Sequence, residues 1–154
     1  MRIAVLADTH ADRLEYLPKK VVDALSGVDL IIHAGDFTDL KLLTDLKRLK
    51  EVKAVHGNMD SRQLKSILPT KEVFEVGGKR IGITHGSGAP WGIEERVRRL
   101  LESDLIDIIV YGHTHRSQNK VINDILFFNP GKAADSFGII TIDGEIRGEV
   151  ISSR

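Results

Sequence analysis

Histidine, aspartate and asparagine residues that follow short apolar runs are the residues of this 154-residue chain best suited to chemistry. Their side chains bind borderline divalent ions such as Mn²⁺, Ni²⁺, Fe²⁺ and Zn²⁺. The clearest example is IIVYGHTH, residues 108–115, in which a strand-like apolar run ends in His113 and His115. Two imidazoles at the end of a buried strand raise the hypothesis that they hold a metal ion.

The same kind of ending recurs after four other apolar runs. In chain order the five endings are Asp8-Thr9-His10, His33-Ala34-Gly35-Asp36, His56-Gly57-Asn58-Met59-Asp60, Thr84-His85-Gly86 and Gly112-His113-Thr114-His115. In open α/β sheets, ligands bind at the carboxyl ends of the strands, so these side chains would meet if the five strands shared a sheet. Burying carboxylates and imidazoles together without a metal would be costly. Taken jointly, the endings predict a metal centre.

Each of these residues taken alone has a simpler explanation. A single histidine after a strand is more often hydrogen-bonded in the core or at the surface than bound to a metal. For this reason His33, just before Gly35, is predicted to be structural or to support a ligand without binding the metal itself, and His56 is predicted to lie at the rim of the site. A single aspartate is often a helix cap, and we predict that role for Asp60.

Alternating strand-like and helix-like patterns position these motifs. Apolar runs predict strands over 3–7, 30–32, 52–55 and 106–111. Amphipathic spacing predicts a helix with Pro18 in its first turn and Gly27 at its end, and a second helix over 40–49. A third helix is predicted to turn Ile93, Val97, Leu100 and Leu101 inward. The pairs Gly77-Gly78 and Asp143-Gly144 predict hairpin turns.

The order of these elements indicates the fold class. β/α crossovers come first and antiparallel pairs follow, which is typical of an α/β protein with a mixed sheet, or two stacked sheets, and helices on the outer faces. We find no linker, low-complexity segment or tandem repeat. The length suits one domain over residues 1–154.

Composition narrows the class of protein. The absence of cysteine excludes disulfides and thiolate metal ligands and suits a reducing cytoplasm. Lys plus Arg and Asp plus Glu both number 22, so we expect no dedicated nucleic-acid surface. The first apolar run is too short for a signal peptide or membrane span. We expect a cytoplasmic protein without a membrane partner. Trp91 and Phe137 suit a core or an interface equally, which leaves a homo-oligomer open.

The five motifs, in this order and spacing, resemble the signature of the calcineurin-type metallophosphoesterases. With Asn129-Pro130-Gly131, the resemblance spans nearly the whole chain. The short length and this last motif are most similar to the small YfcE-type phosphodiesterases of bacteria and archaea. The resemblance implies the metallo-dependent phosphatase fold, a four-layer αββα sandwich of two mixed β-sheets flanked by helices.

The resemblance also implies a dinuclear metal centre. One ion would be held by Asp8, His10, Asp36 and His115, and the other by Asp36, Asn58, His85 and His113, with Asp36 as the bridge. Asp36, Asn58 and His85 are the expected catalytic residues. We expect Mn²⁺, with Ni²⁺, Fe²⁺ and Zn²⁺ as alternatives. The implied reaction is hydrolysis of small phosphodiesters by a hydroxide that bridges two divalent ions.

Some positions depart from the family pattern. Many relatives carry histidine after the asparagine, where this chain has Met59, which cannot donate a proton. The proton donor for the leaving group is therefore not identified. Ser87 replaces a histidine that relatives often carry after the T-H-G motif, and Lys132 replaces their usual serine after N-P-G. With Asn58, we name Arg116 and Lys132 as candidate substrate contacts, although a solvated loop lysine is the simpler explanation.

Two other functions remain open at this point. The first is a phosphomonoesterase or nuclease that uses the same centre. The second is a non-catalytic scaffold of the retromer-subunit type, in which this fold works through apolar surface patches. The presence of every ligand position favours chemistry. The natural substrate, the physiological metal and the oligomeric state are not predicted.

Overall fold

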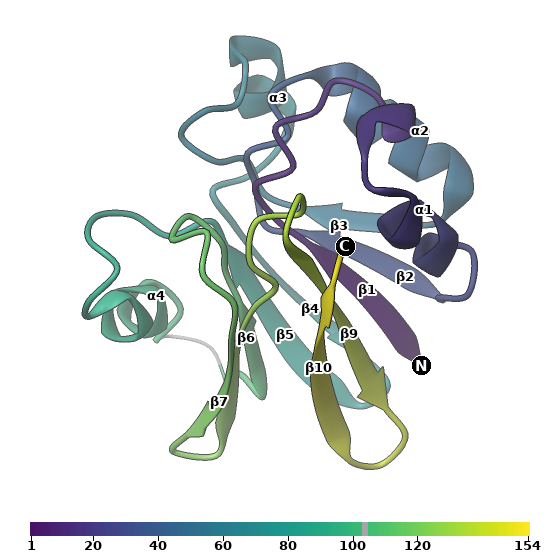
Figure 1. Cartoon of the computed structure of the whole chain (residues 1–154). Helices are drawn as coiled ribbons and strands as arrows, with labels where there is room; N and C mark the ends of the chain where they lie inside the picture. The colour runs from purple at the N-terminus through teal and green to yellow at the C-terminus, as the bar shows by residue number, and fades with distance from the viewer. Residues whose placement is uncertain (103–104) are drawn as a thin grey trace.

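Two five-stranded β-sheets face each other in the computed structural model, which describes residues 1–102 and 105–154 (Figure 1). The first sheet has the order β10 (Ile146–Ser152), β9 (Ser136–Ile142), β1 (Arg2–Leu6), β2 (Leu30–His33) and β3 (Val52–Ala54). Strands β1, β2 and β3 are parallel, whereas β9 pairs antiparallel with both β1 and β10.

The second sheet has the order β4 (Lys71–Val76), β5 (Lys79–Thr84), β6 (Ile108–Val110), β8 (Ile125–Asn129) and β7 (Gln118–Ile122). Its three central strands, β5, β6 and β8, are parallel, and its two edge strands are antiparallel to their neighbours. Both sheets are therefore mixed, as predicted.

Alternation of side chains along the strands divides the core into layers. In β1, Ile3 and Val5 pack between the sheets with residues such as Ile83 of β5, whereas Ala4 and Leu6 pack on the opposite face. This period of two follows from the pleat of a strand. The face that holds Ala4 and Leu6 is covered by α1 (Lys19–Leu25), α2 (Leu40–Leu49) and α3 (Arg62–Ile67).

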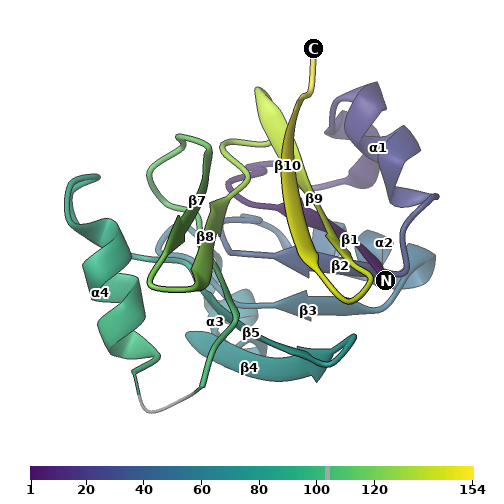
Figure 2. The same cartoon turned by 90° about the horizontal axis from the view of Figure 1, so that it is seen from below.

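Helix α4 (Ile93–Leu100) covers the outer face of the second sheet, where Ile93 and Val97 pack with Tyr111 and Phe127. Figure 2 shows α4 on one side of the two sheets and α1 and α2 on the other. The four-layer αββα sandwich of the metallo-dependent phosphatase fold is confirmed. Among the described residues, no helix combines the length and the apolar character that crossing a membrane would require.

Two predictions about apolar side chains are resolved by their burial. Leu100, predicted to face inward, is 47% exposed, because it lies at the edge of the buried face of α4 and lines an open pocket. Phe137 is buried in the core, whereas Trp91 is 79% exposed.

Several turns and helix ends follow from local sequence. Gly77 and Gly78 both have positive φ and join β4 to β5, as predicted. Helix α1 begins at Lys19, so Pro18 caps it rather than standing in its first turn. The sequence analysis missed the turn between β7 and β8, where Asn123 and Asp124 adopt left-handed conformations that suit these two residue types.

The five motif-bearing strands belong to two sheets, and not to one. Strands β1, β2 and β3 lie in the first sheet, and β5 and β6 lie in the second. Their carboxyl ends still converge, because glycines let the loops approach closely. A Cβ atom on Gly112 would lie 2.9 Å from Cβ of Ala7, and one on Gly35 would lie 2.8 Å from Nδ1 of His85. Both contacts connect one sheet with the other.

Candidate metal centre

The loops that carry the predicted ligands have strained backbones. Asp8, His10, Asp36, His113 and His115 all have φ between 46° and 70°. A non-glycine residue in this left-handed region costs on the order of 1–3 kcal/mol, and such residues gather at functional sites. Five of the seven predicted ligands therefore hold conformations that packing and hydrogen bonding must impose.

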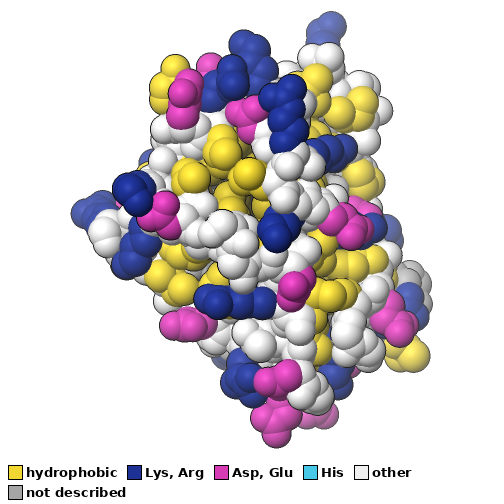
Figure 3. Space-filling model, turned by 90° about the vertical axis from the view of Figure 1, so that its right-hand side faces the viewer, with side chains coloured by type: hydrophobic (Ala, Val, Ile, Leu, Met, Phe, Trp, Pro, Cys, Tyr) yellow, Lys and Arg dark blue, Asp and Glu magenta, His cyan; other side chains and the backbone are white. Residues whose placement is uncertain are grey.

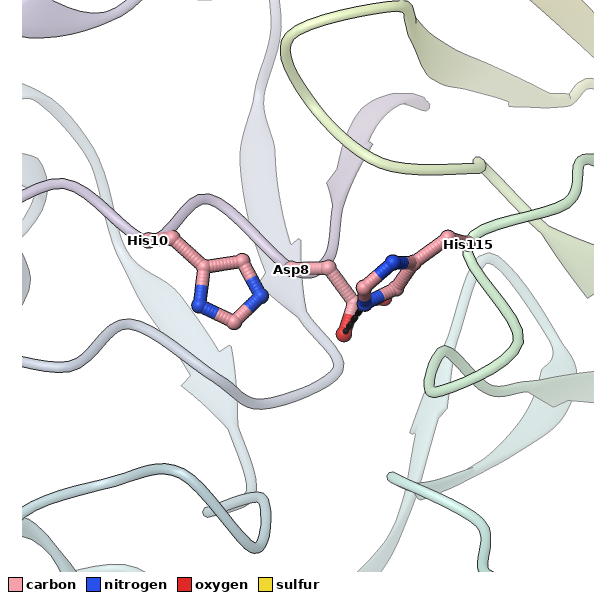
Figure 4. Close-up of side chains that lie close together, drawn as sticks. All are labelled: Asp8, His10 and His115. Atoms are coloured by element: carbon pink, nitrogen blue, oxygen red, sulfur yellow. Dashed lines mark ion pairs between the residues drawn. The ribbon is translucent and has the colours of Figure 1, made fainter.

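One group of donors consists of Asp8, His10 and His115, each with a ligand atom within 4.8 Å of the others. Nε2 of His115 is 3.5 Å from Oδ1 of Asp8, an ion-pair distance marked by the dashed line in Figure 4. The rings of His10 and His115 meet edge to face, with centroids 5.6 Å apart. Asp8 is buried and both histidines are exposed, so the group opens towards solvent.

A second group consists of Asp8, Asp36 and His85, all three buried. Nε2 of His85 is 3.3 Å from Oδ2 of Asp36 and 3.9 Å from Oδ1 of Asp8. The side-chain oxygen of Asn58 lies 3.1 Å from the same nitrogen. Asp8 thus belongs to both groups, whereas Asp36 belongs to the second. The bridging role of Asp36 stays a prediction.

His113 lies next to the second group. Its ring centroid is 5.3 Å from that of His85, and its backbone N–H donates to Oδ2 of Asp8 at 3.1 Å. All seven predicted ligand residues are therefore brought to one end of the sandwich, although their role as ligands stays a prediction.

Backbone carbonyls fix the proton positions of two of these histidines. Nδ1 of His85 lies 2.7 Å from the carbonyl oxygen of Ala34, and Nε2 of His113 lies 2.9 Å from that of Gly88. A carbonyl can only accept, so each of these ring nitrogens carries the proton. In the neutral form of each ring, the lone pair is therefore on Nε2 of His85 and on Nδ1 of His113, which is the form of imidazole that binds a metal.

The buried carboxylates differ in their electrostatics. Burial raises the pKa of Asp8 to about 6, and the charge of Asp36 adds to this, while His85 opposes it. Burial also acts to raise the pKa of Asp36, but its hydrogen bonds with His85 and Met59 outweigh that effect and hold it below the ordinary value. His85 is affected in the opposite sense, because Asp36 outweighs burial and raises its pKa.

The surroundings of one carboxylate oxygen indicate whether these residues fit a metal ion. Oδ1 of Asp8 is buried and has no hydrogen-bond partner among the described residues. An unpaired buried carboxylate oxygen is costly unless a cation neutralises it. This oxygen lies 3.9 Å from Nε2 of His85 and 3.5 Å from Nε2 of His115, so divalent ions held by the two donor groups would neutralise it. The donor set fits the divalent ions that the family resemblance implies.

Asp60 does not cap the following helix, and that prediction is wrong. The cap of α3 is Ser61, whose hydroxyl accepts from the N–H of Leu64 at 3.2 Å. Asp60 is buried and accepts three backbone N–H groups instead, those of Gly57 at 2.7 Å, Thr38 at 2.8 Å and Asp36 at 2.9 Å. Because Asp36 and Thr38 are both left-handed, this carboxylate holds a strained loop in place.

Asp60→Asn should therefore weaken metal binding without removing a ligand. The new amide group would face N–H groups that need an acceptor, which costs about 1–3 kcal/mol. We expect the affinity for Mn²⁺ to fall about 10- to 100-fold, as for other groups that orient ligands. Calorimetric titration measures this, with Asp124→Asn in the exposed β7–β8 turn as the control. Unchanged affinity in Asp60→Asn would refute the orienting role.

His33 is structural, in agreement with the sequence analysis. It is fully buried and stacks on Phe37, with centroids 3.5 Å apart. The N–H of Gly35 donates to its Nδ1 at 3.1 Å, so Nε2 carries the proton and donates to the hydroxyl of Thr9 at 3.0 Å. That hydroxyl donates in turn to the carbonyl of Asp36 at 3.3 Å. Burial lowers the pKa of His33 to about 3, which keeps the ring neutral.

The Asn129-Pro130-Gly131 motif supports the loop that carries His113 and His115. The buried amide of Asn129 donates to the carbonyl of Gly112 at 3.0 Å and to the hydroxyl of Thr114 at 3.1 Å. Its oxygen accepts from the N–H of Gly131 at 2.9 Å. Thr114 therefore faces Asn129, and the motif acts on the site through the backbone.

The candidate substrate residues Arg116 and Lys132 lie in the loops that follow β6 and β8. Arg116 is exposed and lines a pocket of about 320 Å³ with Trp91 and Thr114. Lys132 is half-buried, and its carbonyl accepts from the N–H groups of Asp135 and Ser136. Substrate contacts by Arg116 and Lys132 remain predictions.

Met59 and His56 lie close to the predicted ligand Asn58 in the chain. Met59 is 59% exposed, and its backbone N–H donates to Oδ1 of Asp36 at 2.9 Å, so it contacts the site through the backbone and leaves its side chain free. His56 lines the same pocket as Asn58, which agrees with its predicted place at the rim.

Comparisons with known proteins identify the family. The sequence profile of the calcineurin-like phosphoesterase superfamily domain matches residues 1–142. A probable metallophosphoesterase of Methanocaldococcus jannaschii is 44% identical over 85% of this chain and 67% of its own length. A phosphodiesterase of the same organism is 28% identical over 92% of this chain and 90% of its own length.

Among solved structures, Vps29 of Entamoeba histolytica in complex with zinc superposes with a TM-score of 0.78, at 25% identity and over 100% of both chains. The family profile covers all five motifs, and the structure gathers the side chains of these motifs at one end of the sandwich. The chain belongs to the calcineurin-like phosphoesterase superfamily.

Proposed function

We propose that this protein is a metal-dependent phosphodiesterase that hydrolyses small phosphodiesters with two divalent ions. The observation that carries the proposal is the buried Oδ1 of Asp8, which has no hydrogen-bond partner among the described residues and lies near imidazoles of two donor groups. The phosphodiesterase relative from M. jannaschii supports this choice of reaction. Donors of nitrogen and oxygen without sulfur suit Mn²⁺, our first choice, and also Ni²⁺, Fe²⁺ and Zn²⁺.

When bound, two divalent ions polarise the phosphoryl oxygens and lower the pKa of a water molecule, which supplies a nucleophile near neutral pH. The protein's part is to hold them with Asp8, His10, Asp36, Asn58, His85, His113 and His115. Two carboxylates offset only half of the charge of two such ions, and the histidines are expected to bind as neutral rings. The loaded site is therefore positive and attracts an anionic diester.

Asn58 is exposed at the mouth of this cluster, beside His85. Its side-chain amide can donate hydrogen bonds to a phosphoryl oxygen, which is its proposed role. Met59 follows it and offers no proton, so the leaving group has to depart as an anion or take its proton from water. The protein should therefore favour esters with good leaving groups, such as aryl esters.

Introducing a proton donor with Met59→His should change this preference. The exposed position accommodates an imidazole, and general acid catalysis contributes about 10²- to 10⁴-fold where protonation limits the rate. We expect a larger gain in kcat for an alkyl phosphodiester than for an aryl phosphodiester. Steady-state kinetics on both substrates measures the difference, with Met59→Gln as the control without an acid. Equal gains on both substrates would contradict the proposed role of this position.

Metal reconstitution tests the proposal itself. Metal-stripped protein is reloaded with Mn²⁺, Ni²⁺, Fe²⁺ or Zn²⁺ in turn and assayed on an aryl phosphodiester and the matching monoester. We expect hydrolysis to require metal, to be fastest with Mn²⁺ and to favour the diester. A preference for the monoester would instead support a phosphomonoesterase.

A scaffold function is the second candidate, and the likeness to Vps29 over the whole chain favours it. Stoichiometric metal binding without hydrolysis of either ester would support this function. A nuclease is less well supported. The net charge is zero, and on the face drawn in Figure 3 basic and acidic side chains are intermixed rather than gathered by sign.

A further inference from the structure

A pocket of about 570 Å³ opens beside the predicted ligands Asn58 and His85. Its walls come from the loop after β3, from α3, from the end of β5 and from α4. The volume lies in the range of pockets that bind small organic molecules. Because the two predicted ligands form part of its lining, a molecule bound at the metal centre has direct access to it.

One wall of this pocket is apolar. Val97 and Leu100 of α4 line it together with Thr70 and Thr84. The hydroxyl of Thr84 donates to the carbonyl of Thr70 at 3.3 Å, so this polar group is already satisfied within the protein. Leu100 remains 47% exposed, which leaves apolar surface that a bound group would cover. Covering such surface favours binding in proportion to its area.

The charges in the pocket are of one sign. Nζ of Lys65 donates to the carbonyl of Asn58 at 3.1 Å. The guanidinium of Arg96 donates to the carbonyls of Ser87 and Trp91, each at 3.0 Å, and to that of Ala89. These partners are neutral, so they leave both positive charges in place. None of the described residues that line the pocket is acidic.

The loop over 86–92 is fixed before any ligand arrives. Arg96 ties three of its carbonyls to α4, and Gly88 in the same loop accepts from Nε2 of His113. A pocket with pre-positioned walls loses little conformational entropy when it binds a rigid group. The pocket is therefore better suited to a planar ring than to a flexible chain.

We propose that this pocket binds one ester group of the substrate, a planar and largely apolar ring such as an aryl group or a nucleobase. It selects against an ester group that carries a cation, because Lys65 and Arg96 repel it. The inference rests on the proposed function, since the pocket acts on a phosphodiester held at the adjacent metal centre.

Direct binding to the Mn²⁺-loaded protein tests the inference without relying on hydrolysis. The probes are dimethyl phosphate, methyl phenyl phosphate, the methyl ester of thymidine 5′-phosphate and the methyl ester of phosphocholine, each titrated by calorimetry. We expect at least one ring-bearing diester to bind about tenfold more tightly than dimethyl phosphate. The choline diester should bind no more tightly than dimethyl phosphate. The phenyl and thymidine probes distinguish an aryl pocket from a nucleoside pocket.

Variants assign the effect to the pocket. Thr70→Trp fills it from an exposed position and should reduce the advantage of the ring to less than about threefold, while dimethyl phosphate binds as before. Val121→Trp adds the same side chain to β7, where Val121 is 67% exposed and does not line the pocket, and should keep the full advantage. Lys65→Glu should improve binding of the choline diester relative to the phenyl diester.

Each outcome decides the inference. A ring advantage of equal size in the wild type and Thr70→Trp would overturn it, as would tighter binding of the choline diester by the wild type. If the ring-bearing probes bind as expected but aryl phosphodiesters are not hydrolysed, the pocket stands and the phosphodiesterase function fails. If aryl phosphodiesters are hydrolysed but the ring brings no advantage, the phosphodiesterase function stands and this inference fails.

Discussion

Asp8→Asn is expected to abolish phosphodiester hydrolysis and to weaken the binding of both metal ions. Asp8 takes part in both donor groups, and its buried Oδ1 accepts no hydrogen bond from the described residues. Groups that merely orient ligands are worth about 10- to 100-fold in affinity, so we expect losses above about 100-fold here. Metal content after dialysis and kcat/KM measure the effect. Wild-type metal content with wild-type kcat/KM in Asp8→Asn would remove the basis for the proposed centre.

The same variant should stabilise the metal-free protein. Burial raises the pKa of Asp8 from 3.8 to about 6, so the folded state binds a proton more readily than the unfolded state. Ionised Asp8 therefore lowers the free energy of unfolding above about pH 6, by on the order of 2–3 kcal/mol. Asp8→Asn should recover much of this near pH 8, and the gain should vanish below about pH 4. Urea denaturation of both proteins at the two pH values checks the sign.

Asp36→Asn is the matched comparison for the metal result. The family resemblance makes Asp36 the bridge, whereas the structure places Asp8 in both donor groups and Asp36 in one. If Asp36 bridges, its substitution weakens both ions. If its substitution weakens one ion and Asp8→Asn weakens two, Asp8 holds the shared position.

Acid should destabilise the metal-free protein steeply through His33. Its pKa falls from 6.5 to about 3 on folding because burial penalises the charged ring. Below about pH 6.5 the unfolded state binds a proton that the folded state refuses, so stability is lost as the pH falls towards 3. The full loss is roughly 4–5 kcal/mol.

His33→Asn isolates this contribution, because asparagine does not titrate and its oxygen can accept from Gly35 in place of Nδ1. The variant should be less stable near neutral pH, where it loses the stacking on Phe37 and the hydrogen bond to Thr9. Its free energy of unfolding should fall less steeply between pH 6.5 and pH 4. Parallel slopes for the two proteins would show that His33 is not the responsible group.

Much of the fold follows from local sequence patterns. Apolar runs of three to six residues marked the strands that carry the motifs, and a glycine pair marked the turn at Gly77 and Gly78. The predicted ligands could be named from the sequence for the same reason, since each lies within four residues of the end of such a run. The burial of Leu100 was mispredicted because burial at the edge of a helix face depends on neighbouring elements. The turn at Asn123 was missed because it lacks the glycine that usually marks a two-residue hairpin turn.

Asp60 shows where local reasoning fails. An aspartate just before a helix resembles a cap, and the adjacent Ser61 offers the same signal. Which of the two caps the helix was decided by the loop after β2, whose N–H groups lie within reach of Asp60. That loop is 22 to 24 residues away in the chain, so no local pattern reports the contact.

The sequence alone determined the identity and order of the donor residues and the mixed α/β class, because strand runs, glycine turns and donor types are local properties. The tertiary structure alone decided that Asp8 joins two donor groups and that its Oδ1 finds no hydrogen-bond partner in the part of the chain that the structure describes. It also decided that Ala34 and Gly88 set the proton positions on His85 and His113. These features arise where the ends of two facing sheets approach one another. Such an approach depends on packing between distant segments, which the order of residues along one strand does not specify.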